Sequence, residues 1–297
     1  MPDFLLCTDL DRTLLPNGEP PESPQARALL GRIASRDDVN LAYVTGRSRH
    51  LVEEAMVQYS LPTPDWLIAD VGTSLYRVHQ SRWQRSSAWE AELDRCWQHQ
   101  SFEDFAQSLA GLGGITLQEP AKQSRHKLSF YHDPQVPSST LREQIQPRLL
   151  DAGIAANLIF SCDEVAGVGL LDILPAMADK LRAVRFLIEQ NDYSREHTLF
   201  AGDSGNDLVI LASDIPSVIV ANASADLIRQ ARQLASEAGT TPHLYVAKGG
   251  YQGMNGNYSA GILEGLAHFH PQLMRQVSEE EVQGEALPIC AQPGCDN

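Results

Sequence analysis

The sequence has few positive charges and no long apolar run. Its 297 residues include 23 Lys and Arg against 38 Asp and Glu, which gives a net charge of −15. A chain with this balance lacks the basic surface that nucleic acids require, and anionic lipids repel it. No stretch approaches the roughly 18 consecutive apolar residues that would span a bilayer. We therefore expect neither a nucleic-acid partner nor a membrane. An anionic substrate would need a local group of binding residues to hold it against the negative net charge.

Cysteine is also scarce. The cysteines are odd in number and scattered along the chain: Cys7, Cys96, Cys162, Cys290 and Cys295. Such a set is typical of unpaired thiols in a reducing cytoplasm rather than of a disulfide framework. The first residues include Asp3 and Asp9, and they lack the basic flank and apolar core of a secretory signal. These features predict a cytoplasmic protein.

The order of local patterns predicts an α/β fold. Short β-rich runs alternate with helical patterns, as in the βαβ units of a doubly wound, mostly parallel, Rossmann-like sheet. One helix is expected shortly after Ser23, which would cap it, and another is expected at residues 178–190. The strands expected in this sheet are residues 4–8, 40–44, 66–70, 198–201, 217–221 and 243–247.

The middle of the chain breaks this alternation and predicts an inserted α+β domain. Its expected elements are strand 127–131, helix 139–151 and strands 157–161 and 169–174. The end of the chain is polar and acidic, so we expect it to be loose. The predicted domains are a catalytic core of residues 1–83 and 175–275, a cap of residues 84–174 and a C-terminal tail of residues 276–297.

The first chemical motif is Asp9-Leu10-Asp11-Arg12-Thr13, directly after an apolar strand. Open α/β sheets bind their ligands at the carboxyl ends of strands. There, an ionised carboxylate can attack phosphorus, and a protonated one can protonate the leaving oxygen. The alternative interpretation is a solvated turn in which Asp side chains accept hydrogen bonds from backbone amides.

The second motif is Gly-Asp-Ser-Gly-Asn-Asp at residues 202–207, again after an apolar run. Two carboxylates and an amide offer the hard oxygen ligands that Mg²⁺ prefers. Such an acidic cluster is compatible with a phosphate only if a cation lies between them. A plain glycine-rich turn is the alternative.

Two further residues complete the set. Thr45 ends a strand before a helix, where a hydroxyl and unpaired amides can hold an anion, although Thr is also a common helix cap. Lys180 lies near the start of the 178–190 helix, where a lysine more often faces solvent.

Together, these four motifs resemble those of the haloacid dehalogenase-like hydrolase superfamily, and an insertion between the second and third motifs resembles its C2B-type cap. Closer similarity is to sucrose-phosphate phosphatases. The segments that carry it are residues 40–48, 127–134, 168–175, 202–207 and 259–269. Two positions depart from that family: Arg12 stands where Asn is expected, and Asp179-Lys180-Leu181 stands where Asn-Lys-Gly is frequent.

The resemblance implies a role for each motif residue. Asp9 would be the nucleophile and Asp11 the general acid and base, with Thr45 and Lys180 as further catalytic residues. The implied Mg²⁺ ligands are Asp9, Asp11, Asp203 and Asp207. The implied substrate-binding residues are Thr45, Gly46, Arg47, Lys127, Lys180 and Asn206.

The expected function is a Mg²⁺-dependent phosphatase that converts a disaccharide phosphate, foremost sucrose 6-phosphate, to sugar and phosphate through an aspartyl-phosphate. Within the same superfamily, a phosphatase for mannosylfructose phosphate and a sugar phosphomutase remain open. A non-catalytic sugar-phosphate sensor is disfavoured, since Asp9, Asp11 and Asp203 are all present. A more remote alternative is a non-catalytic module that partners with the glycosyltransferase making the substrate, and the acidic tail is the segment that suggests such an association.

Overall fold

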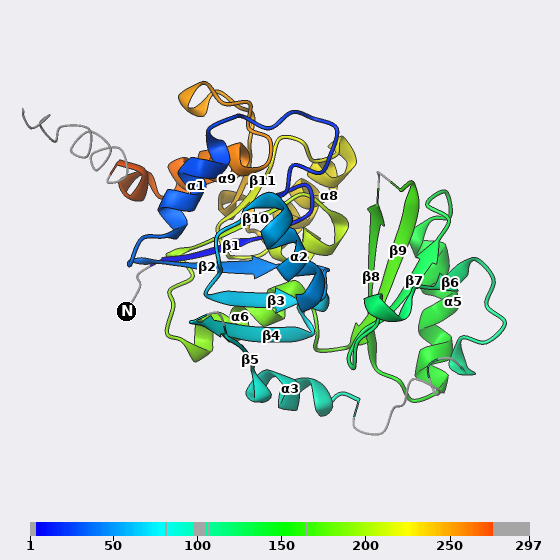
Figure 1. Ribbon diagram of the computed structural model, residues 1–297. Helices are drawn as coiled ribbons and strands as arrows, with labels where there is room; N and C mark the ends of the chain where they lie inside the picture. The colour runs from blue at the N-terminus through cyan, green and yellow to red at the C-terminus, as the bar shows by residue number, and fades with distance from the viewer. Residues whose placement is uncertain (1–3, 81, 98–104, 106, 164–165, 276–297) are drawn as a thin grey trace, which may run out of the picture.

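The computed structural model describes residues 4–80, 82–97, 105, 107–163 and 166–275. Two sheets organise these residues, one of eight strands and one of four (Figure 1). Every helix within the described ranges is too short or too polar to cross a membrane.

The eight-stranded sheet has the order β12-β11-β10-β1-β2-β3-β4-β5. Neighbouring strands from β12 to β3 are parallel, whereas β4 and β5 extend the sheet in antiparallel pairs. The chain starts at the centre with β1 and builds outward on both sides, so the predicted doubly wound sheet is confirmed. The strands are β1 (Phe4–Thr8), β2 (Val39–Val44), β3 (Trp66–Ala69), β4 (Ser74–His79), β5 (Arg82–Arg85), β10 (Thr198–Gly202), β11 (Ser217–Ile219) and β12 (Leu244–Val246).

Helices cover both faces of this sheet. Leu6 and Leu41 face one apolar core with α1, α2 and α9, while Leu5 and Ala42 face the other with α3, α6, α7 and α8. Both faces of the central strands are therefore buried, as expected for parallel strands flanked by helices. The helices are α1 (Ala26–Ala34), α2 (Arg49–Tyr59), α3 (Ser87–Asp94), α6 (Lys180–Gln190), α7 (Leu208–Leu211), α8 (Ala225–Ala238) and α9 (Ser259–Phe269).

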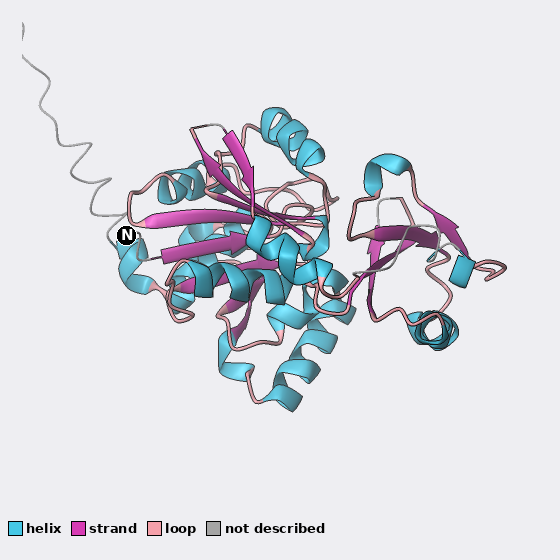
Figure 2. Cartoon of the chain, turned by 90° about the horizontal axis from the view of Figure 1, so that it is seen from below, coloured by secondary structure: helices cyan, strands magenta, loops and turns pink. Residues whose placement is uncertain are grey.

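The four-stranded sheet is antiparallel throughout, with the order β6-β7-β9-β8. One long helix, α5 (Ser138–Asp151), packs its Leu141, Ile145 and Leu149 against this sheet, and the body stands beside the large sheet (Figure 2). We call it the cap. Its strands are β6 (Ile115–Leu117), β7 (Leu128–His132), β8 (Ala156–Asp163) and β9 (Val168–Pro175).

Some local predictions were wrong. Ser23 does not cap α1, because its hydroxyl donates to Asn255 Oδ1 at 2.9 Å and the residue at the cap position is Gln25. Strands β4, β5 and β6 were not predicted. Helix α3 falls within residues 84–174, the range predicted for the cap, and its Trp89 and Leu93 pack into the core of the large sheet.

The domain boundaries remain predictions. The boundary at residue 84 falls inside β5, and the boundary at residue 175 falls at the end of β9. The tail predicted at residues 276–297, with Cys290 and Cys295, lies outside the described residues.

Candidate active site

The motif residues meet where three neighbouring parallel strands end. Strands β10, β1 and β2 lie side by side in the sheet, and their carboxyl ends lead to Asp203, Asp9 and Thr45 respectively. Parallel strands end at the same edge of a sheet, so residues far apart in the sequence come together there. Lys180 is the first residue of α6 and reaches the same point.

The centre of the site is a buried cluster of acids around one lysine. Asp9, Asp203 and Asp207 each offer one carboxylate oxygen, and these oxygens all lie within 4.8 Å of one another. Lys180 Nζ donates to Asp9 Oδ1 at 2.8 Å and to Asp207 Oδ1 at 2.7 Å. The Lys180 side chain is fully buried, so the interpretation as a solvent-facing lysine is excluded.

The electrostatics of this cluster favour an additional cation. Burial, together with the charges of Asp207 and Asp203, raises the pKa of Asp9 well above its usual value, against the opposing effect of Lys180. Burial and Asp207 likewise raise the pKa of Asp203 to about 7. Burial disfavours the charged form of Lys180, but the two carboxylates outweigh it and raise its pKa. Three clustered carboxyl groups with one ammonium form an oxygen donor set that fits a divalent metal ion.

Asp207 is held by the loop that carries it. Its Oδ1 accepts from Lys180, while its Oδ2 accepts from the backbone N–H groups of Asp203 at 3.2 Å and Ser204 at 3.0 Å. Gly202 permits this turn, because a Cβ there would lie 2.7 Å from Asp207 Oδ2. Both oxygens of Asp207 are thus engaged in orienting the loop and Lys180.

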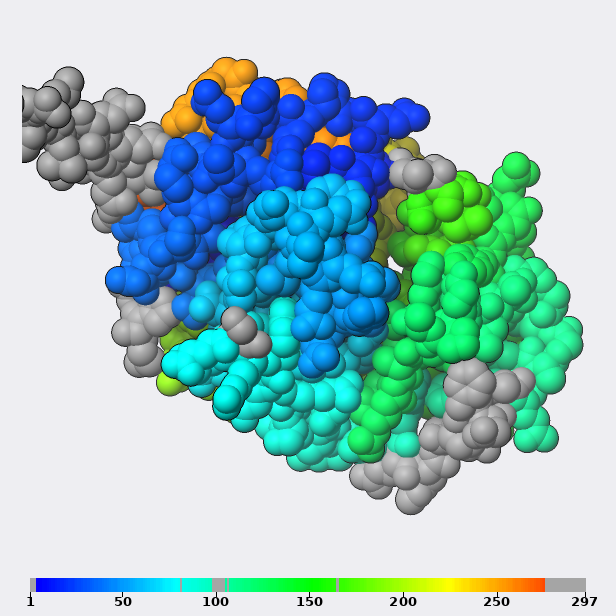
Figure 3. Space-filling model, in the orientation of Figure 1, coloured from blue at the N-terminus to red at the C-terminus, as the bar shows by residue number. Residues whose placement is uncertain are grey.

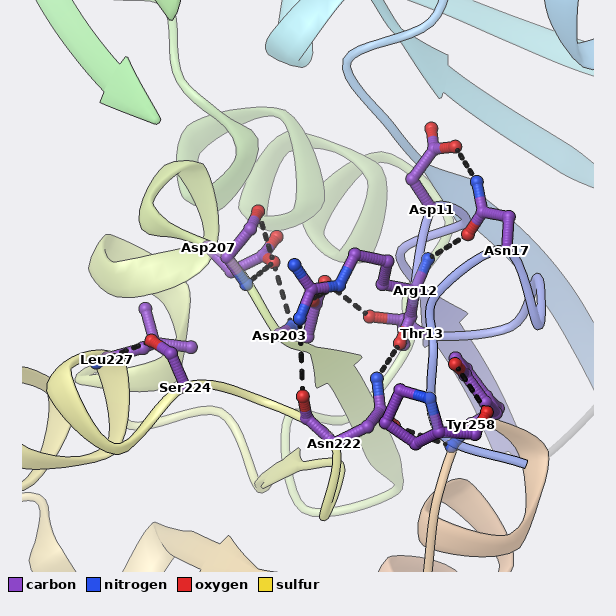
Figure 4. A network of polar contacts seen from close by, with 12 residues as sticks. Asp11, Arg12, Thr13, Asn17, Asp203, Asp207, Asn222, Ser224, Leu227 and Tyr258 are labelled. Atoms are coloured by element: carbon purple, nitrogen blue, oxygen red, sulfur yellow. Dashed lines mark hydrogen bonds and ion pairs between the residues drawn. The ribbon is translucent and has the colours of Figure 1, made fainter. Parts of the chain in front are cut away.

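Asp203 has protein partners of its own. Its Oδ1 accepts from the Thr13 hydroxyl at 3.1 Å, and its Oδ2 lies 3.5 Å from Arg12 Nε (Figure 4). Arg12 has a left-handed backbone, with φ of 58°, and its carbonyl accepts from Asn222 Nδ2 at 2.6 Å. The sequence marked Arg12 only as a departure from the family pattern, and no local signal pointed to Asn222.

Asp11 forms an ion pair with Arg47. Arg47 donates from Nη2 to Asp11 Oδ1 at 2.6 Å and from Nε to Asp11 Oδ2 at 2.7 Å, and Asn17 Nδ2 adds a third bond to Oδ1 at 2.7 Å. Burial opposes ionisation of Asp11, but the Arg47 bonds and charge outweigh it and lower the pKa of Asp11. The resemblance implied that Arg47 binds substrate; in this structure, its guanidinium binds the Asp11 carboxylate.

The remaining predicted residues line the same region. The Thr45 hydroxyl accepts from the Arg47 N–H at 3.2 Å, and α2 begins only at Arg49 after Ser48, so Thr45 is not its cap. Gly46 lies beside the Asn206 amide, since a Cβ at Gly46 would be 3.7 Å from Asn206 Nδ2. From the cap, Lys127 Nζ donates to the Gly46 carbonyl at 3.2 Å. The structure therefore gathers Thr45, Gly46, Asn206 and Lys127 around one loop.

The proteins to which this chain is similar agree with its fold and with the geometry of this site. The sequence model of the family described as sucrose-6F-phosphate phosphohydrolase matches residues 2–270. The chain belongs to this family. It is 46% identical over 292 residues to a putative HAD-like hydrolase of Nitrosococcus oceani, covering 97% of this chain and 78% of that protein. Family membership and the HAD-like fold make the chain a phosphoric monoester hydrolase, as predicted.

Several sucrose-6F-phosphate phosphohydrolase relatives bear on the substrate. The X-ray structure of the Synechocystis sucrose-phosphatase in complex with sucrose and phosphate superposes with a TM-score of 0.72 at 27% identity, covering 91% of this chain and 98% of that one. Sucrose-phosphatase 1 of Nicotiana tabacum is 28% identical; the match covers 90% of this chain and only 59% of the tobacco protein. The chain thus spans about three fifths of that plant relative.

Two other relatives have different names. A mannosylfructose-phosphate phosphatase of Agrobacterium fabrum is 31% identical over 233 residues, covering 77% of this chain and 87% of that protein. A glucosylglycerol-phosphate synthase of Pseudomonas anguilliseptica is 29% identical over 232 residues, covering 77% of this chain but 28% of that protein. The family is therefore clear, whereas the relatives differ in the sugar they are named for.

Replacing Lys180 with Met tests the electrostatic balance of the cluster. Removing one member of a buried ion pair should lower the free energy of unfolding by about 3 kcal/mol or more at pH 8. Without Lys180, the folded-state pKa of Asp9 rises further, so the folded protein binds more protons than the unfolded one. The loss should therefore shrink as the pH falls from 8 to 5.5, and Mg²⁺ should restore part of the stability at pH 8.

Denaturant unfolding at both pH values, with and without Mg²⁺, measures this effect. Arg185→Met is the matched control, because Arg185 pairs with Asp214 at 2.8 Å on the surface and should contribute less than about 1 kcal/mol. Equal losses in the two variants at pH 8 would show that Lys180 does not balance the acidic cluster.

Proposed function

We propose that the chain is a Mg²⁺-dependent phosphatase that hydrolyses a disaccharide phosphate, foremost sucrose 6-phosphate, to the free sugar and inorganic phosphate. The observation that carries this proposal is the buried cluster of Asp9, Asp203 and Asp207 around Lys180, beneath a cap that contributes Lys127. Its similarity to a sucrose-phosphatase that binds sucrose and phosphate supports the choice of sugar.

In the proposed mechanism, the Asp9 carboxylate attacks phosphorus and the bond from phosphorus to the sugar oxygen breaks, which leaves an aspartyl-phosphate. Asp11 protonates the departing oxygen and then deprotonates the water that hydrolyses the intermediate. An ionised carboxylate has no proton to give, so Asp11 must first be protonated and released from Arg47. We assign the phosphoryl oxygens to Thr45, the Gly46 amide, Asn206 and Lys180.

The cluster explains why a cation is needed. A phosphate beside two ionised carboxylates experiences repulsion of about 4 kcal/mol for each unit-charge pair at 4 Å and an effective dielectric of 20. Mg²⁺ would neutralise part of the charge on the phosphoryl group. The proposed ligands are Asp9, the Asp11 carbonyl and Asp203. Asp207, whose oxygens already bind Lys180 and the loop amides, would orient the site.

Alternative activities can be distinguished directly. A mannosylfructose-phosphate phosphatase would prefer that sugar phosphate in the same assay, whereas a phosphomutase would return the phosphoryl group to sugar and need a bisphosphate activator. Release of inorganic phosphate without an activator identifies a hydrolase. The predicted cytoplasmic location remains part of the proposal.

Association with the enzyme that makes the substrate is a second proposal. Its support is that a similar segment occupies 28% of a glucosylglycerol-phosphate synthase. Co-purification with a glycosyltransferase would support this association, and its absence from a native pull-down would count against it.

Asp9→Asn should lower turnover by at least ~10³-fold, because an amide cannot attack phosphorus. The variant should still fold, because Asn keeps the shape of Asp, Lys180 retains its bond to Asp207 and one of the clustered negative charges is lost. Phosphate release and denaturant unfolding measure the two effects. Asp38→Asn, which changes an Asp paired with Arg36 on the surface, is the control. Substantial activity in folded Asp9→Asn would exclude Asp9 as the nucleophile.

Activity should disappear in excess chelator and return with Mg²⁺, whereas Ca²⁺ should restore it poorly. The larger ion accepts more oxygen ligands, so it can bind both Asp9 oxygens and leave none to attack. Phosphate release after metal removal and stepwise addition of each ion measures this requirement. Full activity in the presence of chelator would contradict the proposed cation.

A substrate panel tests the sugar. Sucrose 6-phosphate, or a close disaccharide analogue, should exceed fructose 6-phosphate and p-nitrophenyl phosphate by at least ~100-fold in kcat/KM, equivalent to about 2.7 kcal/mol of transition-state binding. Lys127→Ala should reduce the difference in kcat/KM between the disaccharide phosphate and the other two substrates. If the three substrates react within about fivefold of one another, the cap does not select a disaccharide and the enzyme is a broad sugar phosphatase.

A further inference from the structure

We infer that Asp70, which begins the turn after β3 and which no sequence motif marked, is a positioning residue that holds the cap closed over the active site by pairing with Lys127. This inference deepens the proposed function and rests on it for its kinetic consequence. Its geometric basis is independent of the substrate.

Lys127 connects the cap with the core. It precedes β7, and its side chain is only 5% exposed although it crosses from one sheet to the other. Its Nζ lies 3.2 Å from the Gly46 carbonyl and 3.4 Å from Asp70 Oδ1. The ammonium therefore contacts two core loops, one of which carries Thr45.

Asp70 begins an unusual turn directly after β3. Asp70 and Val71 both have left-handed backbones, with φ of 53° and 58°, and such a conformation is costly for a β-branched residue. Two hydrogen bonds hold the turn against the Thr45 loop, from Asp70 N–H to the Arg47 carbonyl at 2.9 Å and from Val71 N–H to the Thr45 carbonyl at 3.1 Å. The surrounding structure thus fixes where Asp70 lies.

The same turn also contacts the start of α6. Gly72, with φ of 97°, packs so closely that a Cβ there would lie 2.4 Å from the Asp179 carbonyl oxygen, immediately before Lys180. The turn at residues 70–72 therefore bridges the Thr45 loop and the helix that carries Lys180. A cap residue that binds Asp70 is therefore positioned relative to both the Thr45 loop and the start of α6.

The charges at this contact are complementary and buried. Asp70 is 4% exposed, and its Oδ2 accepts from the Ser74 hydroxyl at 3.0 Å, which leaves Oδ1 facing Lys127. Burial raises the pKa of Asp70, although Lys127 opposes this shift. Each charge needs the other once water is excluded, so the pair favours the closed cap over an open one.

A second contact closes the cap on the other side of the site. A Cβ at Gly205 would lie 2.7 Å from the Phe160 carbonyl oxygen of β8, and Gly205 adjoins Asn206. The green cap lies directly against the blue and cyan core surface in Figure 3. A sugar bound between the cap and the core would depend on both contacts, whereas a small aryl phosphate would depend mainly on the core.

The test uses Asp70→Asn, Lys127→Met and the double variant. Asn retains the size of Asp and tolerates a left-handed backbone, so this change removes the charge and preserves the turn. For the best disaccharide phosphate, each single variant should lower kcat/KM by about tenfold or more, with a loss in kcat as well as an increase in KM. For p-nitrophenyl phosphate, the loss in Asp70→Asn should be less than about threefold. The double variant should lose no more than the worse single variant, because both remove one interaction.

Asp214→Asn is the matched control, since it removes a surface carboxylate paired with Arg185 and should change neither rate. Equal losses for both substrates in Asp70→Asn, or losses that multiply in the double variant, would overturn the inference. If Asp70→Asn fails to fold, Lys127→Met removes the same pair from the cap side without altering the turn.

Hydrogen exchange separates this inference from the proposed function. Without substrate, peptides covering residues 45–48, 70–74 and 124–132 should exchange faster in Asp70→Asn and Lys127→Met than in the parent, while α8 should be unchanged. If no disaccharide phosphate is hydrolysed, the proposed function fails, yet faster exchange confined to these segments still supports the cap contact. Unchanged exchange in these segments would overturn it.

Discussion

The buried Lys180 ammonium is the interaction on which the site depends. It neutralises part of a cluster of three carboxyl groups whose burial together is costly, because Asp207 and Asp203 raise the pKa of Asp9 and Asp207 also raises the pKa of Asp203. To reach that position, α6 must begin beside the ends of β1 and β10. The close approach of Gly72 to Asp179 fixes the start of this helix from the other side. The order of the strands and the start of α6 thus both place Lys180 where it neutralises part of the acidic cluster.

The protein's own positive groups neutralise only part of the charge of the acidic cluster, which leaves the cluster suited to bind a cation. Lys180 bonds to Asp9 and Asp207, while Thr13 and Arg12 contact Asp203, so the carboxylates are oriented without being fully neutralised. Arg12 adds a positive charge at a position where the family pattern has Asn. This charge lies 3.5 Å from Asp203 Oδ2 and opposes the rise in the pKa of Asp203, so it offsets part of the negative charge of the cluster. A departure from the family pattern therefore still acts on the same electrostatic balance.

Whether the sequence alone could predict an interaction depends on how far apart its residues lie along the chain. The strands and the positions of Asp9, Thr45 and Asp203 depend on local apolar runs and on the rule that parallel strands end at one edge, and the structure brings these residues together. Lys180 lies on a helix, where the local pattern favoured a solvent-facing side chain, and only the family resemblance implied its place in the site. The Arg47–Asp11 pair links residues whose side-chain partners are chosen by tertiary geometry, and no local pattern encodes it. Ser23 shows the same limit, since its hydroxyl bonds to a loop more than 200 residues away instead of capping its own helix.

The same contrast between local motifs and long-range contacts distinguishes the groups that would carry out the chemistry from those that would select the substrate. The groups that would handle the phosphoryl unit lie on short motifs at the ends of neighbouring strands and at the start of α6. The groups that would meet the sugar come from the cap, and their positions depend on contacts with the core that include Lys127 with Asp70 and Phe160 with Gly205. A small change in either contact would shift the cap relative to an unchanged phosphoryl site. Relatives that share this core can therefore differ in the sugar they are named for, and selectivity has to be sought at the cap–core boundary.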